Sequence, residues 1–363
     1  MSGAAKLSPL EWQVKQSLQD HGICDGLYLI AVSGGLDSMC LLAILNRLKA
    51  KLNVELAVSC VFHGWSKQDA FDSSWLDVNE VDRIQDQFRR NSWNMVRQSA
   101  LNLGIPFYSN IESPEQARFL APQGEAALRA LRLDHWRKLM PKLAQNHAAG
   151  RSWLVLAHHR DDLLETQLLR LMRGTGAEGF ARALPFQRGS VIRPLLAHDR
   201  VTLKRYAQLN AIEWLDDPSN RELGALRNWL RQFWLPELER KRPGACRSLS
   251  RSFELLAEMA AELLAESLKS KTVGPLESVT EQNYAKGLLM PQFLALNPAD
   301  QRRELAKYMS TIGIKNYTRG HIDEIIKRVA SPRRHLVFRS AGYWWHVNPE
   351  RLAASAQKEN CAK

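Results

Sequence analysis

The chain has 363 residues, enough for two domains that each bury a hydrophobic core. Its 45% apolar content argues against a disordered chain, and no apolar run has the length of a membrane span or a signal-peptide core, so we expect a cytoplasmic protein. The formal net charge of +12 suits a polyanion such as nucleic acid or an anionic membrane surface, while five scattered cysteines without a Cys-x-x-Cys pair argue against a zinc knuckle, an iron–sulfur site or a disulfide framework.

The first predicted unit is a strand, a Gly-rich turn and a helix. A helix is expected over residues 8–21, a buried strand over residues 27–32 and a second helix over residues 39–45. Glycine lets the turn adopt positive φ and approach a ligand, so that backbone N–H groups, two serine hydroxyls and the helix dipole face an anion. The sequence therefore predicts a phosphate cradle formed by Ser33, Gly34, Gly35, Leu36, Asp37 and Ser38.

A second strand is predicted over residues 54–62 and ends at His63, before a charged crossover helix within residues 67–103 and a third short strand at residues 105–108. The carboxyl ends of parallel strands line the ligand crevice of such a sheet. His63 is therefore expected near a nucleotide held by the Gly-rich turn, and a plain turn histidine is the alternative.

A helix that opens at Gly124 carries Glu125, Arg129 and Arg132. The two arginines are three residues apart and share a face with the glutamate. The pattern fits either a solvated charged face or an arginine pair that contacts phosphates or a carboxylate.

A fourth strand at residues 153–157 runs into the stretch from His158 to Thr166, which contains two histidines and three acids. Asp162 and Glu165 are spaced i,i+3, so one helical face presents both. Acids in a first helical turn can serve only as partners of the helix dipole. Functionally, this pair could hold magnesium, bind a substrate ammonium or accept a proton. Zinc is a weaker interpretation because no cysteine or further histidine has matching spacing.

A fifth strand at residues 191–196 and a helix at residues 199–209 complete an alternation of strands and helices. The alternation predicts an α/β fold, a doubly wound parallel sheet, over residues 1–220. A connecting helix, kinked or ended by Pro236, is expected within residues 221–245.

The remaining residues, 246–363, are predicted to form a mostly helical, basic domain. Its predicted elements are helices over 250–269, 298–310 and 319–330, and a hairpin that turns at residues 340–342, with no structure expected after Arg351. One apolar stripe of the first helix is expected to be core: Phe253, Leu255, Leu256, Met259, Leu263 and Leu264. The many basic residues, Arg333 and Arg334 among them, favour a surface that tracks phosphates.

Several motifs together resemble a known family. The turn from Ser33 to Ser38 resembles the pyrophosphate loop of the ATP-pyrophosphatase, or PP-loop, superfamily. Six further motifs follow in family order, and with them roughly residues 20–240 resemble the tRNA(Ile)-lysidine synthetases: His63-Gly64, 125–132, 158–166, 173–176, 192–195 and 217–228.

This resemblance implies a PP-loop ATPase fold and a ligase that uses ATP and Mg²⁺. ATP adenylates the wobble cytidine of a tRNA(Ile) with the anticodon CAU, free L-lysine attacks the activated carbon through its side-chain amine, and AMP and pyrophosphate are released. A homodimer is kept open as a further expectation.

The resemblance also implies roles for individual residues. The catalytic set is Asp37, Asp162, Glu165 and Arg129. The nucleotide-binding set is Ser33, Gly34, Gly35, Leu36, Asp37, Ser38, His63 and His158, and Asp37 also helps to place Mg²⁺. The set that binds substrate or tRNA is Arg132, Arg227 and Arg231, and the basic character of the second domain, rather than the resemblance, adds Arg333 and Arg334 to it.

The sequence departs from the family pattern at Phe62, where a polar residue is usual, and at Leu133, where a tyrosine is common. The chain is also expected to be a short form that ends before the last carboxyl-terminal domain of longer members. Two alternatives stay open: another PP-loop ATP pyrophosphatase that modifies tRNA, and a catalytically inactive relative that binds RNA.

Overall fold

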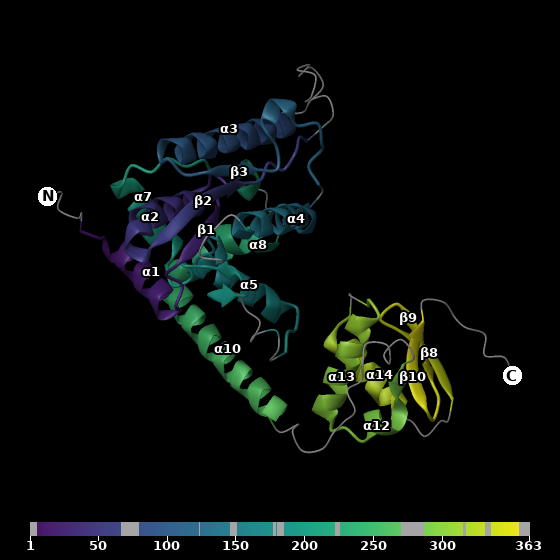
Figure 1. Cartoon of the computed structure of the whole chain (residues 1–363). Helices are drawn as coiled ribbons and strands as arrows, with labels where there is room; N and C mark the ends of the chain where they lie inside the picture. Colours follow the sequence, from purple (N-terminus) through teal and green to yellow (C-terminus); the bar gives the residue numbers. More distant parts are fainter. Residues whose placement is uncertain are drawn as a thin grey trace. The chain divides into compact units, whose positions relative to one another are not determined.

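The computed structural model describes residues 6–66, 80–122, 124–145, 151–176, 179, 185–221, 226–269, 287–314, 317–330 and 335–355. The chain divides into two compact units (Figure 1), each of which is described by itself. The first comprises Met1–Met172 with Ala177–Ala261, and the second comprises Arg173–Gly176 with Glu262–Lys363. The division therefore falls inside a long helix, α10, and not at residue 245 as the sequence suggests.

The first unit alternates strands and helices in the expected order. Its elements are α1 (Pro9–Asp20), β1 (Gly26–Ala31), α2 (Leu36–Leu52), β2 (Val54–Cys60), α3 (Glu80–Asn102), β3 (Phe107–Ser109), the 3₁₀ turn η3 (Pro114–Gln116), α4 (Gly124–Gln145), β4 (Ser152–Val155), α5 (Arg160–Met172), β5 (Gln187–Arg188), β6 (Val191–Ile192), α7 (Arg200–Leu209) and the 3₁₀ turn η4 (Pro218–Arg221). A helical segment follows, made of α8 (Leu226–Trp229), the π-helical η5 (Leu230–Trp234) and α9 (Leu235–Lys241), and then α10 (Ala245–Lys269).

The strands of this unit form one sheet in the order β3-β2-β1-β4-β6-β5. All neighbours are parallel except the edge strand β5, which is antiparallel to β6, so the predicted α/β class is confirmed. The strand predicted over residues 191–196 pairs only over Val191–Ile192. After β1 the chain moves outward to β2 and β3 and then returns to β4 on the other side of β1. The sheet order thus reverses between β1 and β4, which is where open α/β sheets bind ligands.

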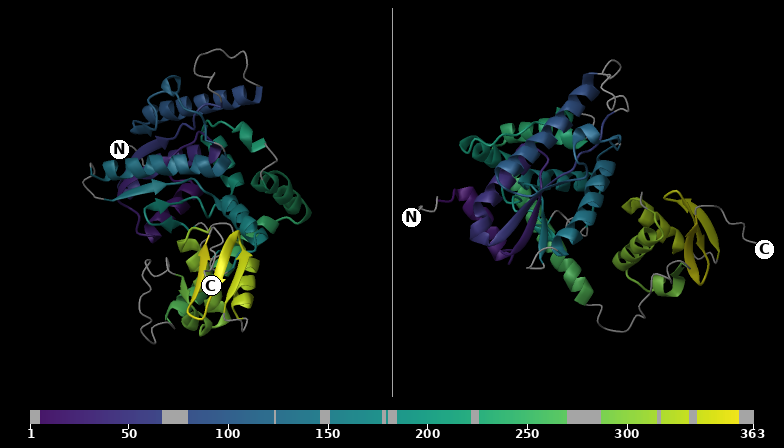
Figure 2. Two further views of the ribbon diagram at one scale, coloured as in Figure 1. Left: turned by 90° about the vertical axis from the view of Figure 1, so that its right-hand side faces the viewer. Right: turned by 45° about the horizontal axis from the view of Figure 1, so that its top comes forward.

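Helices cover both faces of the sheet (Figures 1 and 2). Tyr28 and Ile30 point to one face, where their core cluster includes buried residues of α1, α2, α3 and α7. Leu27 and Leu29 point to the other face, where α4 contributes Leu143. Because both faces are covered, the parallel strands can be almost wholly apolar, and the polar side chains collect at the strand ends.

Pro236 neither ends nor interrupts the helical segment that runs from α8 to α9. The N–H of Leu235 donates to the carbonyl of Leu230, five residues back, which is a π-helical bond. Pro236 then occupies the start of α9, where its missing N–H costs little. The π turn lets the chain pass the proline without breaking the helix.

The second unit combines helices with a sheet that is larger than the predicted hairpin. Its elements are β7 (Leu288–Leu289), α12 (Met290–Leu294), α13 (Pro298–Thr311), α14 (Arg319–Val329), β8 (Leu336–Ser340), β9 (Tyr343–Val347) and β10 (Arg351–Ser355). The four strands are antiparallel in the order β7-β10-β9-β8. The expectation of no structure after Arg351 is wrong for residues 351–355, because Leu352 is buried and β10 pairs with β9 and β7.

The prediction that the apolar stripe of α10 is core is right for Phe253 and wrong for four other members, and the side chain of Leu264 lies outside the described part of the chain. Phe253 is buried against Leu164 and Leu168 of α5, but Leu255, Leu256, Met259 and Leu263 are exposed. Amphipathicity identifies the apolar side of a helix but not the element that covers it. No helix in the described part of the chain, α10 included, is long and apolar enough to cross a membrane.

Gly64 allows the chain to turn closely past another loop directly after His63. Its φ is +94°, and its neighbour Trp65 bridges to Leu120, with the N–H of Ala121 donating to the carbonyl of Trp65 at 2.8 Å. A Cβ on Gly64 would lie 2.7 Å from the backbone carbon of Leu120. The corner therefore depends on glycine for two reasons, conformation and space.

We expect Gly64→Ala to destabilise the protein more than Gly22→Ala. Both glycines have positive φ, but a Cβ on Gly22 would meet no atom within 4 Å, so that variant carries only the conformational cost of roughly 1–2 kcal/mol. The collision at Gly64 should add at least about 1 kcal/mol, because backbone must move. Urea denaturation of the two variants measures the difference, and equal free energies of unfolding would contradict the steric argument.

Candidate functional site

Polar side chains from four neighbouring strands converge at the carboxyl edge of the sheet. His63 follows β2, the Gly-rich turn follows β1, the stretch from His158 follows β4, and Arg193 follows β6. These strands are adjacent in the order β2-β1-β4-β6, so the motifs come together although they are far apart in the chain. The site therefore surrounds the point where the sheet order reverses.

The Gly-rich turn is held by its own hydrogen bonds. The N–H of Ser33 donates to Ser38 Oγ at 3.1 Å, and Ser38 Oγ donates to the carbonyl of Gly35 at 2.9 Å. Positive φ was expected at both glycines; the expectation is right for Gly34, at +82°, and wrong for Gly35, which has an extended conformation at φ −78° and caps α2. Leu36 is buried and anchors the turn to the core.

A side chain on Gly34 would meet α3. A Cβ there would lie 3.1 Å from Ser92 Cβ and 3.3 Å from Met95 Cε. Gly34 also accepts a hydrogen bond on its carbonyl from the N–H of Leu215 at 2.9 Å. The backbone of the turn is thus fixed from two sides, and the N–H groups at the amino end of α2 have the arrangement that binds phosphate.

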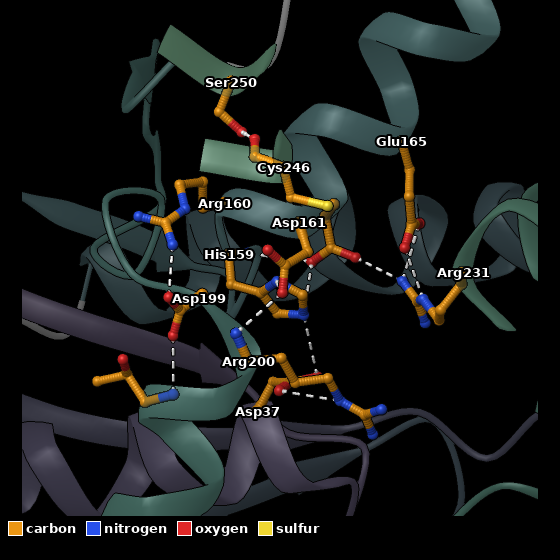
Figure 3. Close-up of polar contacts among 12 residues, drawn as sticks. Asp37, His159, Arg160, Asp161, Glu165, Asp199, Arg200, Arg231, Cys246 and Ser250 are labelled. Atoms are coloured by element: carbon orange, nitrogen blue, oxygen red, sulfur yellow. Dashed lines mark hydrogen bonds and ion pairs between the residues drawn. The ribbon is translucent and has the colours of Figure 1, made fainter. Parts of the chain in front are cut away.

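Asp37 lies in the first turn of α2 and points toward α5 and α7 (Figure 3). Its Oδ2 is 3.5 Å from His159 Nε2, and its Oδ1 is 3.8 Å from Arg200 Nε. Oδ1 is buried without a hydrogen-bond partner among the described residues. A buried carboxylate oxygen with spare acceptor capacity beside a phosphate cradle fits a Mg²⁺ that is held mainly by phosphate oxygens. No group of three or more His, Cys, Asp or Glu residues in the described ranges forms a metal cage of its own.

His159 joins the two acidic parts of the site, a role that the sequence did not reveal. Its side chain is 1% exposed and lies near Asp37 at 3.5 Å and Asp161 at 3.8 Å (Figure 3). Asp162 is 3.4 Å from the same ring. Burial alone would lower the pKa of His159, but the hydrogen bond to Asp37 and the charges of the three carboxylates raise it above its usual value of 6.5. The only signal in the sequence was the doubled histidine itself.

Asp162 and Glu165 share one face of α5, as their spacing predicted, and Arg231 binds both. Figure 3 shows the pairing of Arg231 with Glu165. Arg231 Nε donates to Glu165 Oε1 at 2.6 Å, and its Nη2 donates to Glu165 Oε2 at 2.9 Å and Asp162 Oδ1 at 2.8 Å. The Glu165 side chain is 1% exposed. This is a bidentate ion pair in a nearly dry position, so removal of one partner leaves a buried charge.

The environment separates the pKa values of the two carboxyl groups. Burial raises the pKa of Glu165, and the hydrogen bond and charge of Arg231 offset this only in part. Burial also acts to raise the pKa of Asp162, but the charges of His159 and Arg231 outweigh it and the pKa of Asp162 falls. Asp162 is therefore the firmer anion, and Glu165 is the better proton acceptor.

Arg227 connects α8 to both α4 and α5. Its Nη1 donates to Glu125 Oε1 at 2.8 Å, its Nη2 donates to Thr166 Oγ1 at 3.2 Å, and its Nε is 3.6 Å from Glu165 Oε2. Glu125 was expected to share a helical face with Arg129 and Arg132. Its observed partner is instead Arg227, from the helical segment that runs from α8 to α9. Two arginines from one segment thus approach Glu165.

The predicted nucleotide-pocket histidines are neutral. Burial lowers the pKa of His63 to about 4, helped by the charges of Arg132 and Arg89. Burial also lowers the pKa of His158 to about 4, and its Nδ1 accepts a hydrogen bond from Arg193 Nε at 3.2 Å. A neutral imidazole can accept or donate a hydrogen bond to a base or ribose without adding charge.

Arg129 and Arg132 differ in their surroundings although they lie on one helix. Arg129 is exposed, and its charge is close enough to lower the pKa of His158 and Arg193. Arg132 is half-buried near His63. Both therefore border the site. Arg333 and Arg334 lie outside the described residues.

Arg193 and Arg200 belong to the site although no role was predicted for them. Arg193 also donates to the carbonyl of Pro185 at 2.8 Å, and the N–H of Arg200, at the start of α7, donates to Asp161 Oδ2 at 3.0 Å. Asp161 therefore ties α5 to α7. The motif that contains Arg193 contributed to the family resemblance. The sequence therefore pointed to this residue but did not indicate what it does.

The two departures from the family pattern fall in different places. Phe62 is buried and packs edge-on against the rings of Trp65 and Phe119. Asn110 holds its backbone by accepting from its N–H at 2.8 Å and donating to its carbonyl at 2.9 Å. The Phe62 side chain thus belongs to the core behind His63. Leu133 is partly buried on α4.

The pKa of His63 predicts the sign of one pH dependence. An unfolded histidine takes up a proton near pH 6.5, but the buried His63 does so only near pH 4, so the unfolded state gains protons first as the pH falls. Stability is then lost as the pH drops from about 6.5 toward 4, by roughly 2 kcal/mol at pH 5 for this residue.

His63→Gln should remove that part of the pH dependence. Urea midpoints of the wild type and the variant at pH 7 and pH 5 measure this difference. In the wild type, the ring proton signals of His63 should titrate near pH 4 by NMR. Parallel pH dependence in the two proteins would contradict the assignment.

Comparison with known proteins identifies the family of the chain. The family model described as the PP-loop domain matches residues 7–238. A tRNA(Ile)-lysidine synthase of Bdellovibrio bacteriovorus is 33% identical over 343 residues, which are 94% of this chain and 96% of that protein. Those of Alkalilimnicola ehrlichii and Xanthomonas campestris pv. campestris are 31% and 36% identical over 82% and 65% of this chain, which spans 59% and 48% of their lengths. The chain belongs to the PP-loop family and, within it, to the tRNA(Ile)-lysidine synthases.

Proposed function

We propose that this protein ligates free L-lysine to the wobble cytidine of a CAU-anticodon tRNA(Ile) in the cytoplasm, at the expense of ATP. One observation carries the proposal: the Gly-rich turn after β1 and the acids Asp162 and Glu165 after β4, of which Glu165 is buried, lie together where the strand order of the sheet reverses. A site that activates an oxygen with ATP and then admits an amine needs these two parts side by side.

The nucleotide end of the site is formed by the turn from Ser33 to Ser38. The N–H groups at the amino end of α2 hold the pyrophosphate, and His63 and His158, both neutral, contact the base or ribose. Asp37 is the residue that would hold Mg²⁺, which neutralises phosphate charge when it is bound. Arg200, 3.8 Å from Asp37, keeps that carboxylate oriented.

The amine end of the site is formed by α5. Asp162, the firmer anion, holds the lysine ammonium, and Glu165 takes a proton from it, because only the neutral amine can attack. The amine nitrogen then bonds to the activated carbon of the adenylated cytidine, and the carbon–oxygen bond breaks with its electron pair leaving on AMP. Arg231 contacts both carboxylates, so the lysine ammonium must share them with this guanidinium.

The RNA surface is proposed to be made of cations around this edge. Arg129, Arg132 and Arg227 border the site, and we propose that Arg333 and Arg334, which lie outside the described residues, also contact the tRNA. The net charge of +12 supports phosphate binding of this kind.

The test is an incorporation assay with ATP, magnesium, labelled lysine and an isoleucine tRNA transcript bearing the CAU anticodon. A methionine tRNA with the same anticodon is the control. Label in the isoleucine tRNA alone, with AMP and pyrophosphate formed, is the expected result. AMP formation with a different acceptor would move the function to another PP-loop tRNA-modifying enzyme, and binding without ATP cleavage would indicate an inactive relative.

The carboxylate pair gives a sharper prediction. Asp162→Asn and Glu165→Gln should each reduce lysine incorporation by at least about 100-fold, because one loses the charge that holds the ammonium and the other loses the proton acceptor. Both substitutions keep the shape of the side chain. tRNA affinity, measured by filter binding, should change little.

The two variants should differ in their response to lysine. Asp162→Asn should raise the lysine concentration needed for half-maximal rate. Glu165→Gln should mainly lower the maximal rate, and part of that rate should return at higher pH. Wild-type turnover in either variant would refute the role proposed for the residue that was changed. Glu125→Gln is a matched control, because Glu125 is an exposed carboxylate that pairs with Arg227.

A further inference from the structure

The helical segment from α8 to α9 presents an aromatic hollow on the surface of the first unit. The hollow has a volume of about 480 Å³ and is lined by Trp229, Gln232, Phe233, Trp234, Pro236, Glu237 and Arg240. The three aromatic side chains are 41%, 51% and 37% exposed in that order. Large aromatic residues gathered at this level of exposure mark a binding surface more often than a folding requirement.

The opposite face of the same segment is committed to the fold and to the site. Leu230 and Leu235 are buried against α5, and Arg227 and Arg231 extend to Glu165. Trp229 and Phe233 lie two residues on either side of Arg231, which is about 3 Å along a helix axis. The hollow therefore lies at the same level along the helix axis as Arg231 but on the side that faces away from the carboxylates, so a ligand that occupies it does not compete for them.

The lining suits a flat, polarisable, anionic ligand better than an aliphatic one. Indole and phenyl faces stack on planar rings, and Arg240 and Lys241 together exceed the charge of Glu237 by one, which favours a ligand that carries phosphate. Glu237 is the one acid in the lining, and its charge is matched by Arg240 at 2.7 Å and Lys241 at 3.7 Å. The chemistry of the hollow is that of single-stranded nucleic acid binding, in which bases stack on aromatic side chains beside cations.

The reaction itself creates a base in need of a stacking partner. A cytidine in a stacked loop cannot present its ring to an enclosed site until it is swung out, and its neighbours then lose a stacking surface. An aromatic platform beside the site replaces that surface and lowers the cost of extraction.

We propose that the hollow formed by Trp229, Phe233 and Trp234 stacks a nucleobase that flanks the wobble cytidine in the anticodon loop. This inference rests on the proposed function, because it takes the RNA loop as the substrate. It assigns to the connecting segment two tasks on its two faces: Arg227 and Arg231 serve the carboxylates, and the aromatic residues hold the RNA.

The experiment uses the full-length protein and an anticodon stem–loop RNA in which 2-aminopurine replaces the adenosine of CAU. Its fluorescence rises when the base is unstacked and is quenched when the base stacks on an aromatic ring. With the wild-type protein the signal should stay quenched on binding. With Trp229→Ala or Phe233→Ala it should rise, and affinity should fall about tenfold or more.

Two variants serve as controls. Trp229→Phe keeps an aromatic face and should retain most of the affinity and the quenching. Trp12→Ala removes an indole that is 55% exposed on α1 and should behave as the wild type. Because all these side chains are exposed, the variants should keep the wild-type melting temperature.

The outcomes separate this proposal from the proposed function. Wild-type affinity and quenching in the Trp229→Ala and Phe233→Ala variants would overturn the hollow as an RNA site, whatever the incorporation assay gives, and would leave it to a protein partner. Weaker binding and higher fluorescence in these variants, together with no lysine incorporation by the wild type, would support the hollow as a single-stranded RNA site. That result would overturn only the proposed ligase activity.

Discussion

The site depends on one buried histidine that lies between carboxylates from two different helices. His159 contacts Asp37 at the start of α2 and Asp162 on α5, so it fixes the phosphate-binding turn relative to the acidic pair. Without a cation between them, two carboxylates at these distances would repel each other in a water-poor position. The raised pKa of His159 is the sign that the folded protein favours the charged ring there. The strand order makes this contact possible, because β1 and β4 are neighbours.

The charges in the site form a network in which each cation contacts several acids, rather than a set of separate ion pairs. Asp37, Asp161 and Asp162 surround His159, while Asp162 and Glu165 share Arg231, and Glu165 also lies near Arg227. Each buried acid thus has a cation within reach, as burial requires. The balance is uneven in one respect that matters for chemistry: Glu165 is the most enclosed acid and holds its proton more readily than Asp162. Two carboxyl groups on one helical face can therefore divide the work of binding an ammonium and accepting its proton.

The sequence was informative wherever the cause was local. The apolar run before Ser33 and the alternation of strands and helices specified the parallel sheet, and i,i+3 spacing placed Asp162 beside Glu165. Features that depend on distant segments were missed. Nothing near His159 in the chain says that Asp37 will approach it, and nothing near Glu125 says that Arg227 will. The stripe of α10 was misjudged because helical periodicity shows that Leu255 and Met259 share a face and is silent on whether anything packs against it. The φ of Gly35 was missed because one positive φ, at Gly34, is enough to form the turn.

The π turn at Leu230–Trp234 has a consequence for the length of the chain as well as for its course. A π turn contains about one residue more than an α turn, so it accommodates that residue locally while the helix continues on both sides of it. Arg227 and Arg231, four residues apart on one helical face, reach the same carboxylate, and Leu235 packs inward after the π turn. A one-residue deletion here would restore a regular helix and set the Pro236 ring against the carbonyl oxygen one turn back, at a cost of about 3 kcal/mol. We therefore expect the number of residues between Arg227 and Pro236 to be constrained more tightly than the identities of the exposed side chains among them.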